Sequence, residues 1–89
     1  MWTVHIPPRV EKELAALPQQ TQLAIRQTLQ QLQHEARPPG CKKLKGRLHC
    51  WRVRVGSHRL PYDIDDSRRV LLILKIGPRK DVYRFLMHH

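Results

Sequence analysis

The sequence predicts a compact α+β domain in which two N-terminal helices pack on a four-stranded, mostly antiparallel sheet. Three observations lead to this fold class. Apolar residues recur at helical spacing in the first third of the chain, and apolar and polar residues alternate later, as in strands. Proline, glycine and aspartate separate these segments. With 89 residues the chain is expected to form one domain, 1–89, with a single core and a short C-terminal helix.

The N-terminal third predicts one short strand followed by a pair of helices. Residues 3–6 form the strand, which ends at Pro7 and Pro8, and a proline is tolerated at the start of a helix. Pro18 begins the second helix, and the run 38–40, Pro-Pro-Gly, ends it. Each helix has apolar residues at i, i+4 and i+7, which form one face. These residues are Val10, Leu14 and Leu17, then Ile25, Leu29 and Leu32.

The strongest strand pattern in the second half predicts a β-hairpin. Residues 50–55 alternate apolar and basic side chains, which is typical of a half-buried strand. Gly56 and Ser57 form a tight turn, and residues 58–64 form the returning strand. Pro61 removes a ladder donor from that strand. We therefore expect either a bulge at Pro61 or a strand edge that faces away from a partner.

A nearly continuous apolar run, 70–76, predicts a central strand covered on both faces. Gly77 and Pro78 end this strand, and Asp81 is expected to cap a last helix that extends to Met87. The predicted core combines the helix faces with inward residues of the sheet. It comprises Val10, Leu14, Leu17, Ile25, Leu29, Leu32, Trp51, Val53, Leu72 and Leu74.

The chain carries a large excess of positive charge. Lys and Arg number 17 against 7 acidic residues, which gives a formal net charge of +10. Such an excess predicts a polyanionic partner, above all nucleic acid. A membrane surface is disfavoured because the basic residues do not follow an amphipathic helix. Since no apolar segment reaches transmembrane length and no signal-peptide pattern is present, we expect a cytoplasmic protein.

The positive charge is concentrated between residues 36 and 62, where eight basic residues occur without a single Asp or Glu. Alternation in the hairpin strand directs Arg52 and Arg54 to the same outward face. Arginine is always charged and offers planar, bidentate donors, so a rigid row of arginines is a good phosphate-binding surface. A solvated strand face remains the alternative interpretation.

The cysteines and histidines do not predict a metal site. Cys41 and Cys50 are expected to remain reduced in the cytosol. Together with His34 and His49 they match no compact zinc motif. We therefore expect neither a metal nor another cofactor, and we interpret Cys50 as a small, half-buried apolar residue.

Four short motifs and the apolar run 70–76 occur in a characteristic order. The motifs are Lys43-Leu44-Lys45-Gly46, Trp51-Arg52-Val53-Arg54-Val55-Gly56, His58-Arg59-Leu60-Pro61-Tyr62 and Gly77-Pro78-Arg79-Lys80-Asp81-Val82-Tyr83. In this order the sequence resembles the RelE/ParE toxin superfamily of bacterial toxin–antitoxin systems, on the RelE side. The resemblance covers nearly the whole chain, and its specific part is the hairpin motif combined with the terminal Gly-x-Arg-x-x-Val-Tyr.

The resemblance implies a RelE-like fold and a ribosome-dependent mRNA endonuclease that cuts codons in the ribosomal A site. In this reaction the 2′-hydroxyl attacks its neighbouring phosphate and gives a 2′,3′-cyclic phosphate. The implied partners are the ribosome, mRNA and a cognate antitoxin with an acidic or amphipathic segment, which would form a hetero-oligomer with the toxin.

The resemblance also implies the site residues. The implied catalytic residues are Arg52, Arg54, Arg59, Arg79 and Tyr83. Apart from the resemblance, we expect Lys42, Lys43, Lys45 and Arg47 to form a diffuse patch that binds ribosomal RNA rather than a set of catalytic residues. The best-studied relatives carry lysines where this chain has Arg52 and Arg54. Arginine effectively cannot change its protonation state, so these two are expected to bind phosphate and stabilise transition-state charge.

Proton transfer then requires another group, and the candidates are Tyr83, His58 and Asp81. A regular strand would direct His58 to the face opposite Arg59. Tyr83 has an alternative interpretation as a half-buried anchor of the last helix, and Trp51 is expected in the core rather than as a base-stacking surface. Two other functions remain open: a ParE-like, non-catalytic inhibitor of DNA gyrase, and a basic RNA-binding module without activity.

Overall fold

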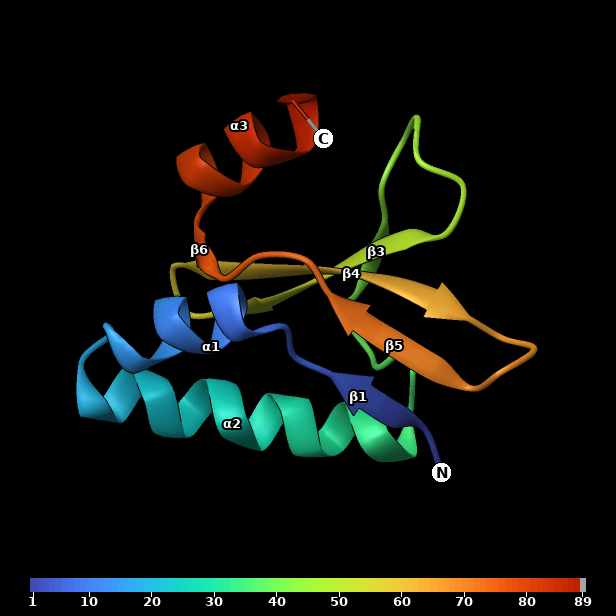
Figure 1. The fold of residues 1–89 in the computed structure, drawn as a ribbon, viewed down its shortest axis with the longest axis horizontal. Helices are drawn as coiled ribbons and strands as arrows, with labels where there is room; N and C mark the ends of the chain where they lie inside the picture. Colours follow the sequence, from blue (N-terminus) through green and yellow to red (C-terminus); the bar gives the residue numbers. More distant parts are fainter. Residues whose placement is uncertain (89) are drawn as a thin grey trace.

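The computed structural model describes residues 1–88; His89, the last residue of the predicted domain, lies outside the described residues. Helices α1 (Pro8–Ala15) and α2 (Gln19–His34) lie on one face of a mixed sheet. Helix α3 (Arg79–His88) projects from the sheet at one end of the molecule (Figure 1). The α+β class predicted from the sequence is confirmed.

Within residues 1–88 the sheet has six strands in the order β1-β5-β4-β3-β2, and β6 pairs with β4 beside the end of β5. Strand β1 is parallel to β5, and the other pairings are antiparallel. The strands are β1 (Thr3–His5), β2 (Lys42–Lys43), β3 (Cys50–Val55), β4 (His58–Asp65), β5 (Val70–Ile73) and β6 (Gly77–Pro78). Strands β2 and β6 were not among the four predicted, because two residues are too few to show alternation.

Prolines determine where both N-terminal helices begin. Pro7 and Pro18 are the N-cap residues of α1 and α2, in agreement with the sequence analysis. Helix α2 ends at His34, before the predicted Pro-Pro-Gly run, because Glu35 already has an extended backbone with φ −145°. The chain is then fixed to the sheet by the buried Tyr62, whose hydroxyl donates a 2.8 Å hydrogen bond to the carbonyl oxygen of Ala36.

The core lies between the two helices and the sheet. Of the ten predicted core residues, the structure buries six and places Leu17 and Trp51 at the core boundary. The prediction was wrong for β5, where Leu71 and Ile73 are fully buried and Leu72 is only half-buried. Leu74 is also half-buried. A shift of one residue exchanges the two faces of a strand, and an unbroken apolar run contains no alternation that reveals the phase.

Pro61 lies opposite a bulge in the neighbouring chain segment. The β3–β4 register is unbroken through the pair Arg52–Pro61. On the other side of β4, Tyr62 pairs with Ile73 and Arg59 pairs with Gly77, so two residues oppose three. The predicted strand 70–76 therefore ends at Ile73, because Pro61 cannot donate to the ladder at this point. The bulged segment, 74–76, leads directly into β6 and α3.

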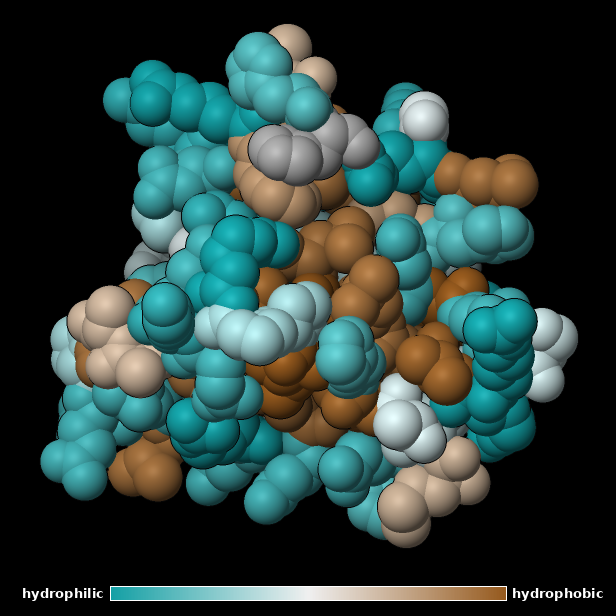
Figure 2. Space-filling view, in the orientation of Figure 1, coloured by the Kyte–Doolittle hydropathy of each residue, from teal (hydrophilic) through white to brown (hydrophobic). Residues whose placement is uncertain are grey.

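The surface is mixed in character. Hydrophobic side chains gather near the middle of the view in Figure 2, and hydrophilic side chains surround them and extend over α3. No helix within residues 1–88 is both long enough and apolar enough to cross a membrane.

Candidate functional site

The β3–β4 hairpin places three arginines on the sheet face that points away from α1 and α2. Gly56 has a φ of +59°, which allows the two-residue turn that sets the hairpin register. In this register Arg54 pairs directly with Arg59, and Arg52 pairs with Pro61. Side chains of paired residues lie on the same face of a sheet, so Arg52, Arg54 and Arg59 share one surface.

Arg79 completes this group at the start of α3. Strand β6 holds Gly77 opposite Arg59, and Arg79 follows two residues later as the first residue of the helix. Burial lowers the pKa of the Arg52 guanidinium, and the positive charges of the other three arginines lower it further. The pKa of Arg59 is lowered by desolvation and then by Arg54 and Arg79. We call these four mutually repelling residues the arginine cluster.

No carboxylate among residues 1–88 neutralises the arginine cluster. Among residues 1–88, none of its four members forms an ion pair, whereas Arg9, Arg26, Arg37 and Arg68 each have a carboxylate partner. The Nη1 atom of Arg52 is buried and has no hydrogen-bond partner. A buried charged donor without an acceptor is costly, and an anionic oxygen is the acceptor that suits it best. The cluster therefore has the character of a phosphate-binding surface.

Tyr83 lies one helical turn after Arg79 on α3, on the same side of the helix. It is 64% exposed, which argues against its interpretation as a half-buried anchor; Val82 is the buried residue of this helix. His58 pairs with Val55 and lies on the sheet face opposite Arg59, as expected. The prediction that Asp81 caps α3 was wrong, because the helix begins at Arg79 and Asp81 lies in its first turn.

The structure divides the predicted RNA-binding patch. Lys42 pairs with Arg52 and therefore lies on the same face as the arginine cluster, whereas Lys43 pairs with Trp51 and lies on the opposite face. Lys45 is exposed in the loop that follows. Arg47 is half-buried, and its Nε atom has no partner. Of the four, only Lys42 extends the arginine cluster.

Arg47 instead lines a hollow of about 910 Å³ at the opposite end of β4. Three carboxylates line the same hollow: Asp63, Asp65 and Asp66. A hydrogen bond from Arg37 lowers the pKa of Asp66. Negative charge of this kind repels a phosphate, so this hollow is not the candidate RNA site. The sequence analysis did not identify this hollow, because two separate segments, 46–49 and 63–72, form it.

The cysteines lie outside the arginine cluster. Cys50 is fully buried rather than half-buried as predicted, and burial raises the pKa of its thiol. In the described part of the chain, no three His, Cys, Asp or Glu side chains come together in a way that could hold a metal ion.

Comparisons with known proteins place the chain in a family. Residues 4–83 match the family described as ParE toxin of type II toxin-antitoxin system, parDE. The curated protein RelE1 of Methanocaldococcus jannaschii is 30% identical over 86 residues, which cover 93% of this chain and 96% of the relative.

Solved structures give the same result. The RelE–RelB complex from Pyrococcus horikoshii contains a chain that is 29% identical, with a TM-score of 0.79 over 88% of this chain and 94% of that one. A variant of the E. coli toxin RelE in the free state has the same fold, with a TM-score of 0.79 at 21% identity over 98% of this chain and 95% of that one. The chain therefore belongs to the ParE toxin family of type II toxin–antitoxin systems, within the RelE/ParE superfamily, and is a RelE-like toxin.

Proposed function

We propose that this toxin is a ribosome-dependent endoribonuclease that cuts mRNA codons in the ribosomal A site. The observation that carries the proposal is the arginine cluster, whose four guanidinium groups lack carboxylate partners among residues 1–88. A cluster of this kind raises the free energy of the folded state and is offset when a polyanion binds. The buried, unpartnered Nη1 of Arg52 supports a phosphate oxygen as the ligand.

The proposed chemistry uses the arginines as fixed positive charges. The 2′-oxygen of a nucleotide forms a bond to the adjacent phosphorus, and the bond from phosphorus to the 5′-oxygen of the next nucleotide breaks. The products are a 2′,3′-cyclic phosphate and a 5′-hydroxyl. Arg52, Arg54, Arg59 and Arg79 stabilise the negative charge that develops on the phosphate oxygens during this step.

Two protons must move in this reaction: one leaves the 2′-hydroxyl and one reaches the departing 5′-oxygen. The arginines remain charged and cannot supply either transfer. Tyr83 is the candidate we propose, because it is exposed and lies one turn from Arg79. His58 lies on the opposite sheet face, which argues against this role.

The proposed partners follow from the same surface. The RelE chains from Pyrococcus horikoshii and from Mycobacterium tuberculosis were crystallised in toxin–antitoxin complexes. We propose that this chain likewise binds a cognate antitoxin, with an acidic or amphipathic segment laid across the basic surface, and that it acts in the cytoplasm. Lys42 would add a phosphate contact to ribosomal RNA beside the arginine cluster.

The second candidate is non-catalytic inhibition of DNA gyrase. Two observations favour it: the matched family is described as ParE, and the first hairpin strand carries arginines rather than titratable lysines. The two functions differ in the damage they leave. A ribonuclease leaves new in-frame mRNA ends, whereas a gyrase inhibitor leaves intact mRNA and broken DNA.

The test is inducible expression followed by mapping of new mRNA 5′ ends, and then cleavage on programmed ribosomes with purified toxin. We expect Arg59→Ala to reduce cleavage by ~10²–10³-fold, the usual effect of losing one transition-state donor. Arg68→Ala is the control, because Arg68 is an arginine near the other end of β4 that is exposed and is paired with Asp65. Intact mRNA with DNA breaks would favour gyrase, and equal activity of both variants would contradict the assigned site.

A further inference from the structure

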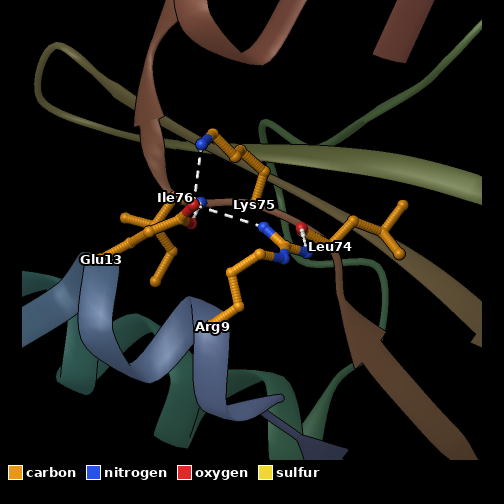
Figure 3. A network of polar contacts seen from close by, with 5 residues as sticks. All are labelled: Arg9, Glu13, Leu74, Lys75 and Ile76. Atoms are coloured by element: carbon orange, nitrogen blue, oxygen red, sulfur yellow. Dashed lines mark hydrogen bonds and ion pairs between the residues drawn. The ribbon is translucent and has the colours of Figure 1, made fainter. Parts of the chain in front are cut away.

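Glu13 is the centre of a polar network that joins α1 to the bulged segment 74–76 (Figure 3). Its Oε2 atom accepts hydrogen bonds from Lys75 Nζ at 2.7 Å and from Arg9 Nη1 at 3.3 Å. Its Oε1 atom accepts a hydrogen bond from the backbone N–H of Ile76 at 3.2 Å. The side chains of Glu13 and Lys75 are 20% and 23% exposed, so this pair is better shielded from solvent than the other ion pairs of residues 1–88.

The network replaces the strand pairing that Pro61 removes. Within the bulge, the N–H of Ile76 is bound by Glu13, and the carbonyl oxygen of Leu74 accepts a 2.8 Å hydrogen bond from Arg9. Helix α1 therefore fixes the two backbone groups that flank Lys75. The chain then has only Gly77 and Pro78 before α3 begins. The path of residues 74–76 consequently determines where the first residue of α3 emerges.

The same two cations also support α3 directly. The guanidinium of Arg9 lies 5.0 Å and the ammonium of Lys75 lies 5.9 Å from the ring centroid of Phe85. Among residues 79–88, Val82 is the one fully buried side chain. With so little apolar burial, the contact between Phe85 and the two cations is a large part of what orients the helix. Glu13 holds both cations in place.

We propose that Glu13 is a positioning residue that orients α3 and thereby sets Arg79 and Tyr83 against the rest of the arginine cluster. Glu13 acts through the N–H of Ile76 and through the cations beneath Phe85, and it does not touch the cluster itself. The inference deepens the proposed function and rests on it, since the placement of Arg79 and Tyr83 matters to catalysis only if the toxin cleaves RNA.

The first test is amide hydrogen exchange of the full chain with the isosteric change Glu13→Gln. We expect exchange of the Ile76 amide and of the α3 amides to accelerate by roughly tenfold, because a charged hydrogen bond to the bulge and the anchor of two cations are lost. Exchange in α2 and β3 is expected to stay unchanged. Glu11→Gln is the matched control, since Glu11 lies on the same helix and pairs with Arg26 at 3.1 Å, away from the bulge.

The second test measures catalysis on programmed ribosomes. Displacement of a reacting group by about 1 Å can cost on the order of 10²-fold in rate, so Glu13→Gln should lower kcat by roughly 10–100-fold. The Kd for the ribosome should stay within about twofold of the wild type, because every basic contact residue is retained. Glu11→Gln should change neither value. A structural defect alone would instead lower the activity of each variant in proportion to its unfolded fraction.

The outcomes separate this inference from the proposed function. Equal α3 exchange in the Glu13 and Glu11 variants would overturn the positioning role, whatever the ribosome assay gives. A wild-type protein that cleaves no mRNA would overturn only the proposed function, since amide exchange still measures the coupling between Glu13 and α3. If Glu13→Gln does not fold, Phe85→Leu takes its place: it should accelerate α3 exchange while the Ile76 amide stays protected. Unchanged α3 exchange in that variant would overturn the proposal.

Discussion

The two ends of β4 carry the same type of residue in opposite electrostatic settings. At the end that begins with His58, the arginine cluster has no carboxylate partner among residues 1–88. At the end that finishes with Asp65, Arg68 pairs with Asp65, and Arg37 binds Asp66 through two hydrogen bonds of 3.0 and 3.1 Å. At the Asp65 end the chain pairs Arg37 and Arg68 with carboxylates, whereas at the His58 end the four arginines of the cluster repel one another.

This difference in charge pairing indicates that the His58 end of β4 is the one suited to bind an anionic ligand. Three of the seven acidic residues, Asp63, Asp65 and Asp66, lie at one end of a single strand. Asp81 lies in the first turn of α3, two residues after Arg79, but within residues 1–88 no acidic residue forms an ion pair with the cluster. Repulsion between like charges lowers stability, and a protein retains such a feature where an external anion relieves it. In the proposed function, that anion is an RNA phosphate or an acidic segment of the antitoxin.

The largest expected contrast comes from removing one arginine at each end. Arg52→Met should reduce codon cleavage by ~10²-fold or more, because a transition-state donor is lost. The same change should raise the free energy of unfolding by about 1 kcal/mol, since a buried, unpartnered nitrogen and three repulsions disappear. Arg37→Met should lower it by about 1 kcal/mol, because Asp66 loses its partner and Trp51 loses a cation 4.8 Å from its ring.

Urea unfolding and cleavage on programmed ribosomes measure both quantities on the same proteins. Loss of stability in Arg52→Met would show that the cluster is a structural feature, and the contrast between the two ends of β4 would fail.

The second largest effect concerns proton transfer, which the arginines of the cluster cannot perform because they remain charged. Tyr83→Phe keeps the ring and removes only the hydroxyl, so we expect cleavage to fall by ~10²-fold while ribosome binding is unchanged. The kcat and the Kd for ribosomes distinguish the two roles of this side chain. Full activity would assign Tyr83 to stacking on a base and move the search for the acid or base to Asp81, which lies in the same first part of α3.

A smaller effect should be visible without RNA. Inorganic phosphate at about ten times its Kd stabilises a binding-competent fold by about 1.4 kcal/mol. For a domain of this size each kcal/mol corresponds to about 4–8 °C in Tm. We expect a rise of several degrees in the wild type and in Arg68→Ala, and a much smaller rise in Arg59→Ala. An equal rise in all three proteins would indicate general salting-out rather than a site at the arginine cluster.

The shared face of Arg52, Arg54 and Arg59 was predictable from the sequence because its cause is local, whereas Arg79 joins them through β6, which was not predicted. Alternation in Cys50–Val55 and the turn at Gly56 determine which residues share a face, and both are visible within ten residues. The helices were equally predictable, since their apolar spacing and their prolines are local signals. The RelE-like fold class followed from these elements and from the resemblance.

Long-range pairing was not predictable in the same way. The bulge opposite Pro61 depends on two pairings of β4 with different registers, and nothing near Leu74 signals it. The pair formed by Glu13 and Lys75 spans 62 residues, and its acidic partner has no distinctive sequence context. The residues of β5 that face the core were predicted wrongly, because this strand is apolar throughout. Each failure concerns a contact whose cause lies in another element.

The smallest expected effect is the pH dependence of stability that arises from the Asp65 end of β4. The hydrogen bond from Arg37 lowers the pKa of Asp66, so the charged carboxylate stabilises the fold. This contribution is complete above the ordinary carboxyl pKa of ~3.9 and is lost as the pH falls through the lowered value. Asp66→Asn should therefore be less stable than the wild type near pH 6, and the two stabilities should converge once the pH has fallen through the lowered pKa of Asp66.

The same titration sharpens the comparison between the ends when Arg59→Ala is included. Arg59 has no carboxylate partner among residues 1–88, so its removal should leave the acid-dependent loss of stability as steep as in the wild type. Urea midpoints measured between about pH 2.5 and 6 give all three curves. A flattened acid response in Arg59→Ala would mean that this arginine is neutralised by a carboxylate after all. The arginine end would then need no external anion, and the physical basis for RNA binding there would be gone.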